Sequence, residues 1–458
     1  MTVGQDRMMR GQWTHATLTS RLLEPLEKRS RGYDVLMVVC LLGTVMLFSA
    51  IGYTFLTGIG TWGNNIPVAW AFAIINFVWW IGIGHAGTFI SAILLLLEQR
   101  WRTSLNRLAE GMTLFALVQA GMFPLLHLGR PWFFYWLIPY PATMGTWPQF
   151  ISTLTWDVAA VFTYTMVSIL FWYLGLIPDL AIVRDRAQSL RKRRIYGFFA
   201  LGWRGTASHW RHYRYAQLLI GGLATPLVLS VHSIVSMDFA IAKLPGWHSP
   251  IFPPYFVAGA IFSGFAMVIT LVVPLRRYFR LEKIITTRHF DLMAKLLLVT
   301  GLIVGYSYAS ELYTAWYSAD GFERWMSFHT RMLGPLAWTW WLVIFCNVVV
   351  PQSLWFSRVR KSTWALWIVS ILIQIGMWTE RFVLIVTSEH QDWLPSSWDM
   401  YTPSVIDGAI IFGTLFFFLL LFLLMVRYVP FIPIAESKEL VYEAAHPRKE
   451  AHATGSLG

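Results

Sequence analysis

Long apolar stretches alternate with short polar segments along the whole 458-residue chain. A helix needs about 20 consecutive apolar residues to cross the hydrocarbon core of a bilayer. Ten stretches reach that length, so the pattern predicts ten membrane-spanning helices. The predicted spans are residues 34–57, 67–97, 106–128, 150–177, 215–241, 255–275, 291–316, 332–356, 362–388 and 404–427.

The order of the spans predicts an all-α, polytopic membrane protein made of two four-helix bundles and two peripheral helices. Residues 67–241 are expected to form the first bundle and residues 255–388 the second. Residues Gly84–Arg102 and Gly259–Arg277 favour this division, because both run from a helix face of small residues into a basic turn. Small residues on a helix face let neighbouring helices approach closely.

The remaining segments follow from this division. Residues 34–57 and 404–427 are the peripheral helices, residues 1–33 an N-terminal segment and residues 428–458 a tail. The first segment is polar and basic and leads directly into a full-length span, so no cleavable signal peptide is expected. Residues 179–214 are basic and lack apolar periodicity, which predicts a loop without a soluble domain.

Lys and Arg residues lie almost entirely on one side of the predicted spans. Of the 36 in the chain, 30 fall in the terminal segments and in the connections on the side of the N-terminus. The connections on the other side hold four, which are Arg130, Lys243, Arg324 and Arg331. Because cytoplasmic loops are enriched in Lys and Arg, both termini are expected to be cytoplasmic.

The composition excludes the usual soluble classes. Hydrophobic residues make up 56% of the chain and charged residues 13%, with a mean hydropathy of +0.53; a soluble domain has about a quarter of its residues charged. The net charge of +12 does not indicate nucleic-acid binding, because the basic residues lie in short segments between apolar runs. Cys40 and Cys346 both lie in spans, which disfavours a disulfide or a cysteine-ligated cluster, and no metal-ligand motif is present.

Ionisable residues inside the spans point to chemistry, because a charge at membrane depth costs about 2.5 to 3.5 kcal/mol on insertion scales. His127 ends the third span, Asp157 lies in the fourth, and His232 and Asp238 lie in the outer half of the fifth. One such residue is usually a satisfied interhelical hydrogen bond, but here three helices place acid–base groups at one outer level. A quinol headgroup needs hydrogen-bonding, proton-accepting partners, which a histidine and a carboxylate supply. The pattern predicts a quinol site with His127, Asp157 and Asp238 as its catalytic residues.

His85 lies near the middle of the second span, between Gly84 and Gly87. It is a packed core histidine, a relay residue or a wall of the quinol cleft. A b-type haem needs two histidines at matching depth on facing helices. His85 and His232 are the one plausible pair, and their predicted depths differ, so neither haem nor an iron–sulfur cluster is expected in this chain.

A second set of ionisable residues lies in or beside the later spans, namely Glu311, His329, Arg331, Glu380 and Arg381. The set is either a proton path or an ion-pair cluster that closes the outer end of the second bundle, with Arg331 and Glu311 as partners. Glu380 and Arg381 are adjacent, so on a helix their side chains point about 100° apart, and adjacency alone does not predict that they pair.

The segment HLGRPWFFYW at His127–Trp136, followed by PYP at 139–141 and TWD at 155–157, resembles the membrane subunits of the NrfD / polysulfide reductase family. The ten spans and the segment GLIPDLA at Gly175–Ala181 are closer still to ActC, the quinol-oxidising subunit type of bacterial alternative complex III. The resemblance covers most of the chain, and residues 127–181 are its specific part.

The resemblance implies quinol oxidation on the periplasmic side of a bacterial inner membrane, with or without proton translocation. Electrons would pass to an iron–sulfur or molybdopterin-like peripheral subunit and on to a multihaem cytochrome c. A second NrfD-like membrane subunit, small membrane subunits and lipids would complete the surroundings, without nucleic acid. The residues expected to bind menaquinol or ubiquinol are His127, Asp157, Asp238, His85, Arg130 and His232.

Two alternatives stay open. Within the family, the chain would be a quinone-reducing membrane anchor of a molybdopterin oxidoreductase. In another class, it would be a proton-coupled secondary transporter, which also has buried carboxylates and a two-bundle repeat. Transporters usually have unwound helices at mid-membrane, whereas most prolines here lie at span ends, with Pro226 and Pro274 as the main internal exceptions.

Overall fold

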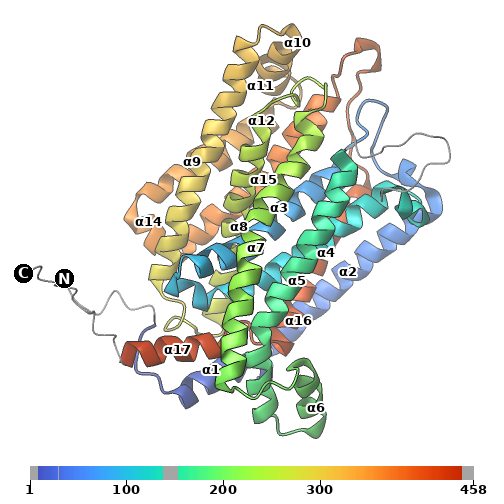
Figure 1. The fold of residues 1–458 in the computed structure, drawn as a ribbon. Coiled ribbons are helices and arrows are strands. Elements are labelled where there is room, and N and C mark those ends of the chain that lie inside the picture. Colours follow the sequence, from blue (N-terminus) through green and yellow to red (C-terminus); the bar gives the residue numbers. More distant parts are fainter. Residues whose placement is uncertain (1–8, 29, 138–152, 446–458) are drawn as a thin grey trace, which may run out of the picture.

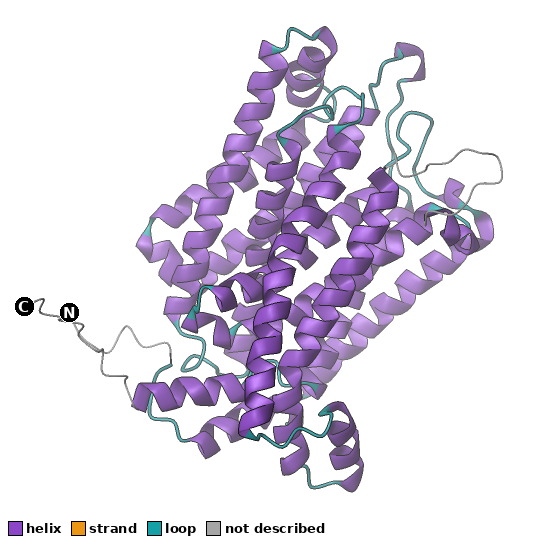
Figure 2. Cartoon of the chain, in the orientation of Figure 1, coloured by secondary structure: helices purple, strands orange, loops and turns teal. Residues whose placement is uncertain are grey.

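The computed structural model describes residues 9–28, 30–137 and 153–445 (Figure 1). Within these residues the regular elements are helices, and none is a strand (Figure 2). Ten helical segments are long and apolar enough to cross a membrane, which confirms the predicted all-α membrane fold. They are α2 (Arg31–Thr57), α3 (Phe72–Leu96), α4 (Asn106–His127), α5 (Thr153–Arg186), α7 (Ala207–Ala240), α8 (Phe252–Tyr278), α9 (Thr287–Tyr317), the segment Ala337–Trp355, α15 (Thr363–Glu389) and α16 (Val405–Tyr428).

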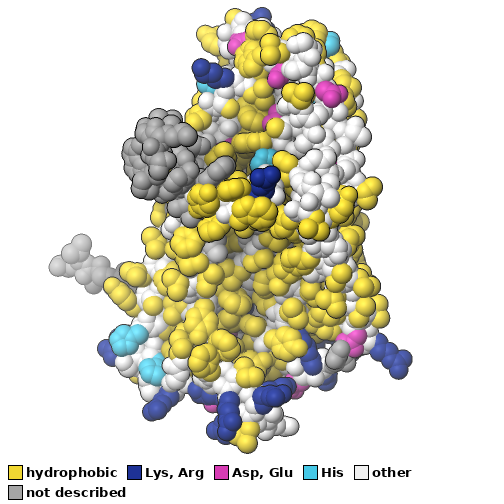
Figure 3. All heavy atoms as spheres, turned by 90° about the vertical axis from the view of Figure 1, so that its right-hand side faces the viewer, with side chains coloured by type: hydrophobic (Ala, Val, Ile, Leu, Met, Phe, Trp, Pro, Cys, Tyr) yellow, Lys and Arg dark blue, Asp and Glu magenta, His cyan; other side chains and the backbone are white. Residues whose placement is uncertain are grey.

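Shorter helices lie at the two ends of the spans. At one end are α1 (His15–Glu27), α6 (Leu190–Phe199) and α17 (Ile434–Ala445), and at the other is α10 (Gly321–Arg324) (Figure 1). Figure 3 shows a broad apolar band across one face of the molecule, with most of the Lys and Arg side chains on that face gathered below it. We call the end that carries α1, α6 and α17 the basic end. The other short elements are η1 (Ile59–Thr61), η2 (Arg100–Ser104), η3 (Pro131–Leu137), α14 (Ser357–Lys361) and η8 (Pro395–Ser397).

Helix α3 lies at the centre of the molecule, and most of its side chains are buried. It contacts α4 and α7 of the first bundle and α8 and α15 of the second. Small residues permit this close packing, because a Cβ atom added at Gly87 would lie 2.0 Å from the carbonyl oxygen of Ala109 on α4. Likewise, a Cβ atom at Gly264 of α8 would lie 1.7 Å from that of Ala86. The small residues predicted on the second span therefore let α3 pack closely on α4 within the first bundle and on α8 of the second.

The peripheral helices α2 and α16 pack against each other. A Cβ atom at Gly43 of α2 would lie 2.2 Å from Phe416, and one at Gly413 of α16 would lie 2.6 Å from Leu47. The pair then contacts the first bundle through α16, which touches α4 and α3. The two peripheral helices thus form one unit on one side of the bundles.

The predicted loop over residues 179–214 is wrong, because helices occupy most of it. Helix α5 continues through Pro178 to Arg186, α6 follows, and α7 begins at Ala207. Asp179 is buried and accepts hydrogen bonds from the backbone N–H groups of Ile434 and Ala435 at the start of α17. The part of a helix that extends beyond the hydrocarbon core of the bilayer need not be apolar. A search for long apolar stretches therefore does not detect the extension of α5.

The predicted single helix over residues 332–356 is interrupted. Before it come a π-helical turn, Trp325–Thr330, and the short α11 (Arg331–Leu333). The chain breaks at Gly334 and Pro335, and the segment then contains a second π-helical turn (Ile344–Val349). Proline cannot donate the backbone hydrogen bond of a helix interior, which explains the break. The parts of this span are α12 (Ala337–Val343), the π-turn, α13 (Val350–Gln352) and η7 (Ser353–Trp355).

Candidate functional site

Two carboxyl groups face each other in the first bundle, at the end opposite the basic end. The side chain of Asp157 on α5 lies within hydrogen-bonding reach of that of Asp238 on α7, which also contacts the Thr153 side chain. Asp157 is only 5% exposed, and within the described residues neither of its oxygens accepts a hydrogen bond from a donor. Asp238 is half-buried. Two carboxyl groups in contact at such a shielded site, with no cation paired to them among the described residues, are stable only if they share a proton. We call Asp157 and Asp238 the carboxyl pair.

His127 and Arg130 lie at the same end of the first bundle. His127 is the last residue of α4, is half-buried and packs beside Trp62, with ring centroids 6.3 Å apart. Its Nδ1 atom is buried and has no partner among the described residues. Arg130 is exposed in the turn that follows. The PYP segment at 139–141 of the family motif lies outside the described residues, and no described contact joins His127 to the carboxyl pair.

His85 and His232 meet in the middle of the first bundle. Their Nδ1 atoms lie 2.7 Å apart, and both side chains are 0% exposed. The prediction that the two histidines lie at different depths is therefore wrong, because their rings are in contact. The two rings contact each other directly, whereas haem ligands bind from opposite faces of a macrocycle. The Nε2 atom of each ring has no partner among the described residues.

Glu380 and Arg381 of α15 form an ion pair, with Glu380 Oε1 at 3.0 Å from an Arg381 guanidinium nitrogen. Adjacency in the sequence alone does not predict this pair, which forms because the long arginine side chain reaches its neighbour's carboxylate. The Tyr308 hydroxyl donates to Glu380, and the Asn347 amide donates to Tyr308 at 2.9 Å. The Arg381 guanidinium also lies over the Phe256 ring, 4.1 Å from its centroid.

A second ion pair joins Arg331 and Glu311 at 2.6 Å, as the ion-pair interpretation of these residues predicts. The Arg331 guanidinium also donates to the Gly246 carbonyl oxygen at 2.8 Å. Next to it, the Glu323 carboxylate on α10 accepts the Gly246 N–H, and burial raises the pKa of Glu323. His329 lies apart from these buried groups: it is exposed and stacks on Trp325 at 3.7 Å.

Sequence reasoning missed a buried charged network at the basic end of the first bundle. Arg107 of α4 is 1% exposed and lies 3.6 Å from Glu110 and 3.5 Å from Asp179. Glu110 is predicted to lie at the inner edge of its span and Arg107 in a basic connection, so both resemble ordinary solvent-facing charges. The signal that was available is the i, i+3 spacing of Arg107 and Glu110, which places both on one helix face.

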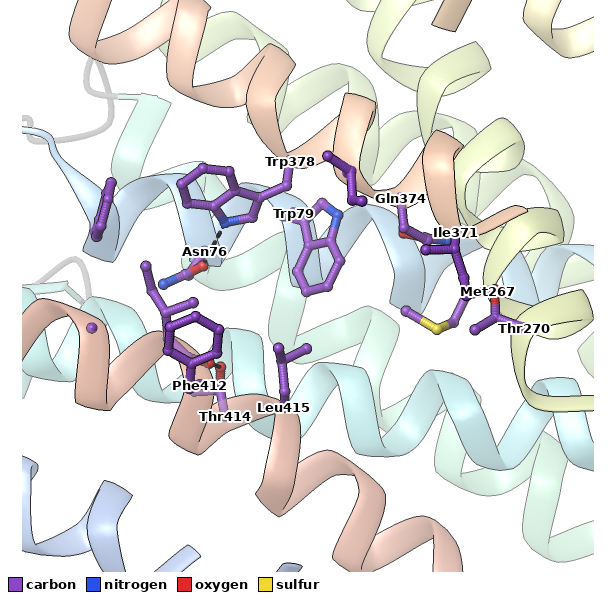
Figure 4. Close-up of a pocket in the computed structure, with 14 residues that line it drawn as sticks. Asn76, Trp79, Met267, Thr270, Ile371, Gln374, Trp378, Phe412, Thr414 and Leu415 are labelled. Carbon is purple, nitrogen blue, oxygen red and sulfur yellow. Dashed lines mark hydrogen bonds between the residues drawn. The ribbon is translucent and has the colours of Figure 1, made fainter. Parts of the chain in front are cut away.

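A cavity of about 520 Å³ lies away from the carboxyl pair, between α3, α8, α15 and α16. Its lining is almost entirely apolar. Figure 4 shows Trp79, Trp378 and Phe412 around it, with the Trp378 indole donating to the Asn76 amide oxygen at 3.0 Å. This position between a bundle and a peripheral helix suits a lipid chain.

No group of three or more metal-ligating side chains occurs in the described parts of the chain. The family model for polysulphide reductase, NrfD, matches residues 60–391. The chain belongs to the NrfD family. The match begins at η1 and ends just after α15, so it contains both four-helix bundles and leaves out the peripheral pair α2 and α16.

Two relatives span nearly the full length of this NrfD-family chain. A putative membrane subunit of dimethyl sulfoxide reductase from Halobacterium salinarum is 24% identical over 420 residues, which cover 85% of this chain and 90% of the relative. A subunit of selenate reductase from Mesobacillus selenatarsenatis is 21% identical over 446 residues, which cover 92% of this chain and 98% of the relative.

Proposed function

We propose that this chain is the membrane subunit of an oxidoreductase complex, in which it exchanges electrons between a membrane quinone and a peripheral reductase subunit. The carboxyl pair carries the proposal, because it offers a shared, buried proton site at the end of the bundle where the family motif lies. The names of the two relatives, one from a dimethyl sulfoxide reductase and one from a selenate reductase, support the reductase context. The predicted anchor of a molybdopterin oxidoreductase thus becomes our main proposal.

The residues of the site suit the two protons of a quinol. Asp157 and His127 would accept the hydroxyl protons, since Asp157 has two oxygens and His127 one ring nitrogen without a described partner. Asp238 would hold the shared proton when Asp157 is ionised. Because the same groups return protons to a quinone, the site supports either direction of electron flow. The exposed Arg130 would bind a carboxylate of the partner protein.

The partners in this proposal follow from the electrons that a quinol releases. A quinol gives up two electrons, and a partner must accept them one at a time. A peripheral subunit that contains iron–sulfur clusters and molybdopterin would do so at the end where Arg130 and the carboxyl pair lie. Lys and Arg residues gather at the basic end, which therefore faces the cytoplasm in our proposal. The opposite end, with Arg130 and the carboxyl pair, then lies on the outer side of the cell membrane.

A second candidate function is quinol oxidation in an alternative complex III. The occurrence of His127 with Asp157 and the ten spans favour it. In that complex the electrons would continue to a multihaem cytochrome c, beside a second NrfD-like subunit. Family membership favours both electron-transfer functions over the proton-coupled transporter.

The test is to purify the native complex through a tag on this chain and to measure quinol-dependent reduction of an artificial acceptor. The Asp157→Asn variant should assemble and lose about 10²-fold in rate, the usual effect of removing a positioned proton-transfer group. Glu389→Gln is the matched control, because Glu389 is a buried carboxylate whose contact is with the Trp70 N–H. Equal rates for Asp157→Asn and the wild type would contradict the site. Bound molybdenum identifies the reductase complex, and a c-type haem spectrum identifies the alternative complex III.

A further inference from the structure

A basic hairpin projects from the basic end of the first bundle (Figure 1). It consists of the end of α5, the helix α6 and the start of α7, and we call residues 184–214 the α6 hairpin. The hairpin contains nine Lys or Arg residues and one acid, Asp185. Among the described residues, the ion pairs of these nine are those of Arg184 with Asp185 and of Arg214 with Glu439. The described acids therefore neutralise only a small part of the positive charge of the hairpin.

Large apolar side chains are exposed in the same hairpin. Leu190 is 72% exposed, Phe198 75% and Leu201 65%. The hairpin is nevertheless held in place, because the Tyr173 hydroxyl of α5 donates to the Phe199 carbonyl oxygen at 2.8 Å. Exposed apolar side chains beside a cluster of basic ones are typical of a segment that lies in the headgroup layer of a membrane. The composition of the hairpin therefore suits the leaflet next to the basic end better than open water.

A cleft of about 280 Å³ lies between α5 and α7, where the two spans meet the α6 hairpin. Ile177 of α5 and Ala216 of α7 line its apolar part. Trp203, His209 and His212 of the hairpin line its polar part. Ligand sites commonly combine an apolar wall with a few placed polar groups, and a wall of each kind suits a molecule with a polar head and an apolar chain.

Two indole N–H groups lie close together beside this cleft. A Cβ atom added at Gly205 would lie 4.0 Å from the Nε1 atom of Trp203 and 4.0 Å from that of Trp210. The two rings meet edge to face, with centroids 5.1 Å apart. No described residue accepts a hydrogen bond from either nitrogen. The turn at Gly205 therefore brings together two indole donors that lack a described acceptor.

His209 adds a third ring N–H group next to the indoles. Its ring centroid lies 5.3 Å from that of Trp203, and its Nδ1 atom accepts the Arg204 N–H at 3.2 Å. With Nδ1 as an acceptor, the neutral ring carries its proton on Nε2, which is then a donor. Among the described residues these three donors have no acceptor, and they lie in a positively charged segment. An anionic oxygen is the group that such donors bind most strongly.

The apolar part of the cleft continues along both spans toward the membrane centre. On α5, Leu170 precedes Ile177 by seven residues and is 55% exposed. On α7, Leu219 and Leu223 follow Ala216 by three and seven residues and are 63% and 57% exposed. These spacings place each set on one face of its helix. A groove of exposed apolar side chains therefore leads from the cleft into the hydrocarbon layer.

The positive charge of the α6 hairpin alone has a simpler explanation, because basic connections fix the orientation of a membrane protein. Orientation needs neither a cleft nor ring N–H donors beside it. It also does not explain why Phe198 and Leu201 are exposed among the basic residues. The charge, the donors and the apolar groove are explained together by one ligand that has a phosphate and acyl chains.

We propose that the cleft binds one anionic phospholipid of the leaflet at the basic end. The lipid phosphate accepts hydrogen bonds from the Trp203 and Trp210 indoles, and one acyl chain lies along the groove between α5 and α7. The positive charge of the α6 hairpin selects a headgroup with a net negative charge over a zwitterionic one. The inference goes beyond the proposed function and does not depend on it. Because α5 carries Asp157 and α7 carries Asp238, the lipid joins the two helices that carry the carboxyl pair.

The test measures lipid binding to the native complex, purified through a tag on this chain and washed with detergent to remove its lipids. Radiolabelled phosphatidylglycerol in detergent micelles is the probe, and the lipid bound per complex is counted. Unlabelled phosphatidylcholine and glycerol 3-phosphate are the competitors, because the first has a zwitterionic headgroup and the second has a phosphate without acyl chains. A variant that lacks the site should bind one phosphatidylglycerol fewer per copy of this chain than the wild type.

Trp203→Phe/Trp210→Phe removes both indole N–H groups and keeps an aromatic ring at each position. Its affinity for phosphatidylglycerol at this site should fall about tenfold or more, as expected for the loss of two hydrogen bonds to a charged group. Arg193→Gln/Arg194→Gln is the matched control, because it removes two exposed charges of α6 that do not line the cleft. Its affinity should stay within about twofold of the wild type. If the tryptophan variant does not assemble, Ala216→Phe serves instead, because the larger side chain fills the cleft.

Several results would overturn the inference. If the intact wild-type complex has no saturable phosphatidylglycerol site, or if the cleft variants bind this lipid as the wild type does, the cleft is not a lipid site. A greater loss in Arg193→Gln/Arg194→Gln than in the cleft variants would show that charge alone drives binding. Equal competition by phosphatidylcholine would remove the selectivity for an anionic headgroup, and equal competition by glycerol 3-phosphate would assign the donors to a free phosphate. Because no quinol is used, each of these results leaves the proposed function standing.

Discussion

The carboxyl pair of the first bundle and the two ion pairs of the second bundle hold their acids differently. In the first bundle, Asp157 and Asp238 face each other, and no arginine or lysine pairs with them in the described structure. In the second, Glu380 lies 3.0 Å from Arg381, and Glu311 lies 2.6 Å from Arg331. An arginine stays charged and fixes its partner as a carboxylate, whereas two facing acids hold a proton that can leave. The carboxyl pair is therefore suited to proton chemistry, and the two ion pairs of the second bundle are suited to helix contacts.

This difference argues against the proton path that the sequence suggests in the second bundle. Arg331, Glu311, Glu380 and Arg381 are all engaged in ion pairs, and His329 is exposed beside Trp325. The two interpretations of this set, a proton path and an ion-pair cluster, differ in what the loss of one partner does. A variant that removes one partner of an ion pair separates the two interpretations, and its expected effect on the free energy of unfolding is several kcal/mol. Variants at a close helix contact and at a carboxyl group outside the spans should have smaller effects on stability.

Glu380→Gln should cost about 3 to 5 kcal/mol in the free energy of unfolding, because it leaves the buried Arg381 without an anion. Thermal unfolding of the purified complex measures the loss. The double variant Glu380→Gln/Arg381→Met should recover most of it, since it removes both charges. A stable Glu380→Gln complex that moves fewer protons per electron would instead support the proton path.

Gly87→Ala should cost about 1 to 3 kcal/mol, the usual range for overpacking a close contact. The added Cβ atom would lie 2.0 Å from the Ala109 carbonyl oxygen, so α3 and α4 must separate. Gly84→Ala is the control, because its Cβ would meet the nearest atom, of Leu117, at 3.4 Å. Thermal unfolding measures both, and equal melting temperatures would show that α3 packs differently.

The smallest effect is a pH dependence at Glu323, which lies outside the spans. Burial raises the pKa of Glu323 above its ordinary value of 4.5. A raised folded-state pKa gives stability that is fully present below the unfolded value and is lost as the pH rises through the folded value. The melting temperature should therefore fall less between pH 4.5 and about pH 7 in Glu323→Gln than in the wild type. Glu27→Gln, at an exposed position, is the control, and its melting temperature should fall as that of the wild type does. An unchanged fall would contradict the burial effect.

The number and order of the spans were predictable from sequence, because membrane helices need long apolar stretches and every backbone group must bond within the helix. The small-residue face around Gly87 was predictable for a similar local reason. The extension of α5 past Pro178 was not, because it depends on Asp179 meeting the start of α17, about 250 residues away. The break at Gly334 was signalled locally by the proline that follows it.

The site was predictable only in part. Span depth placed Asp157 and Asp238 at one level, and the structure brings them into contact. The contact of His232 with His85 was not predicted, because a contact between two helices depends on helix tilt, which a linear pattern does not contain. Arg107 and Glu110 were missed because an inward-facing charge at a span end has the same sequence signal as a solvent-facing one.

The central claim, that the carboxyl pair shares a proton whereas the arginine-paired acids do not, is tested most directly by infrared spectroscopy of the purified complex. A protonated carboxyl group has a carbonyl stretch that an ionised one lacks. The difference spectrum of the wild type and Asp157→Asn should contain this band, and that of the wild type and Glu380→Gln should not. A protonated-carboxyl band that is lost in Glu380→Gln and kept in Asp157→Asn would contradict the account.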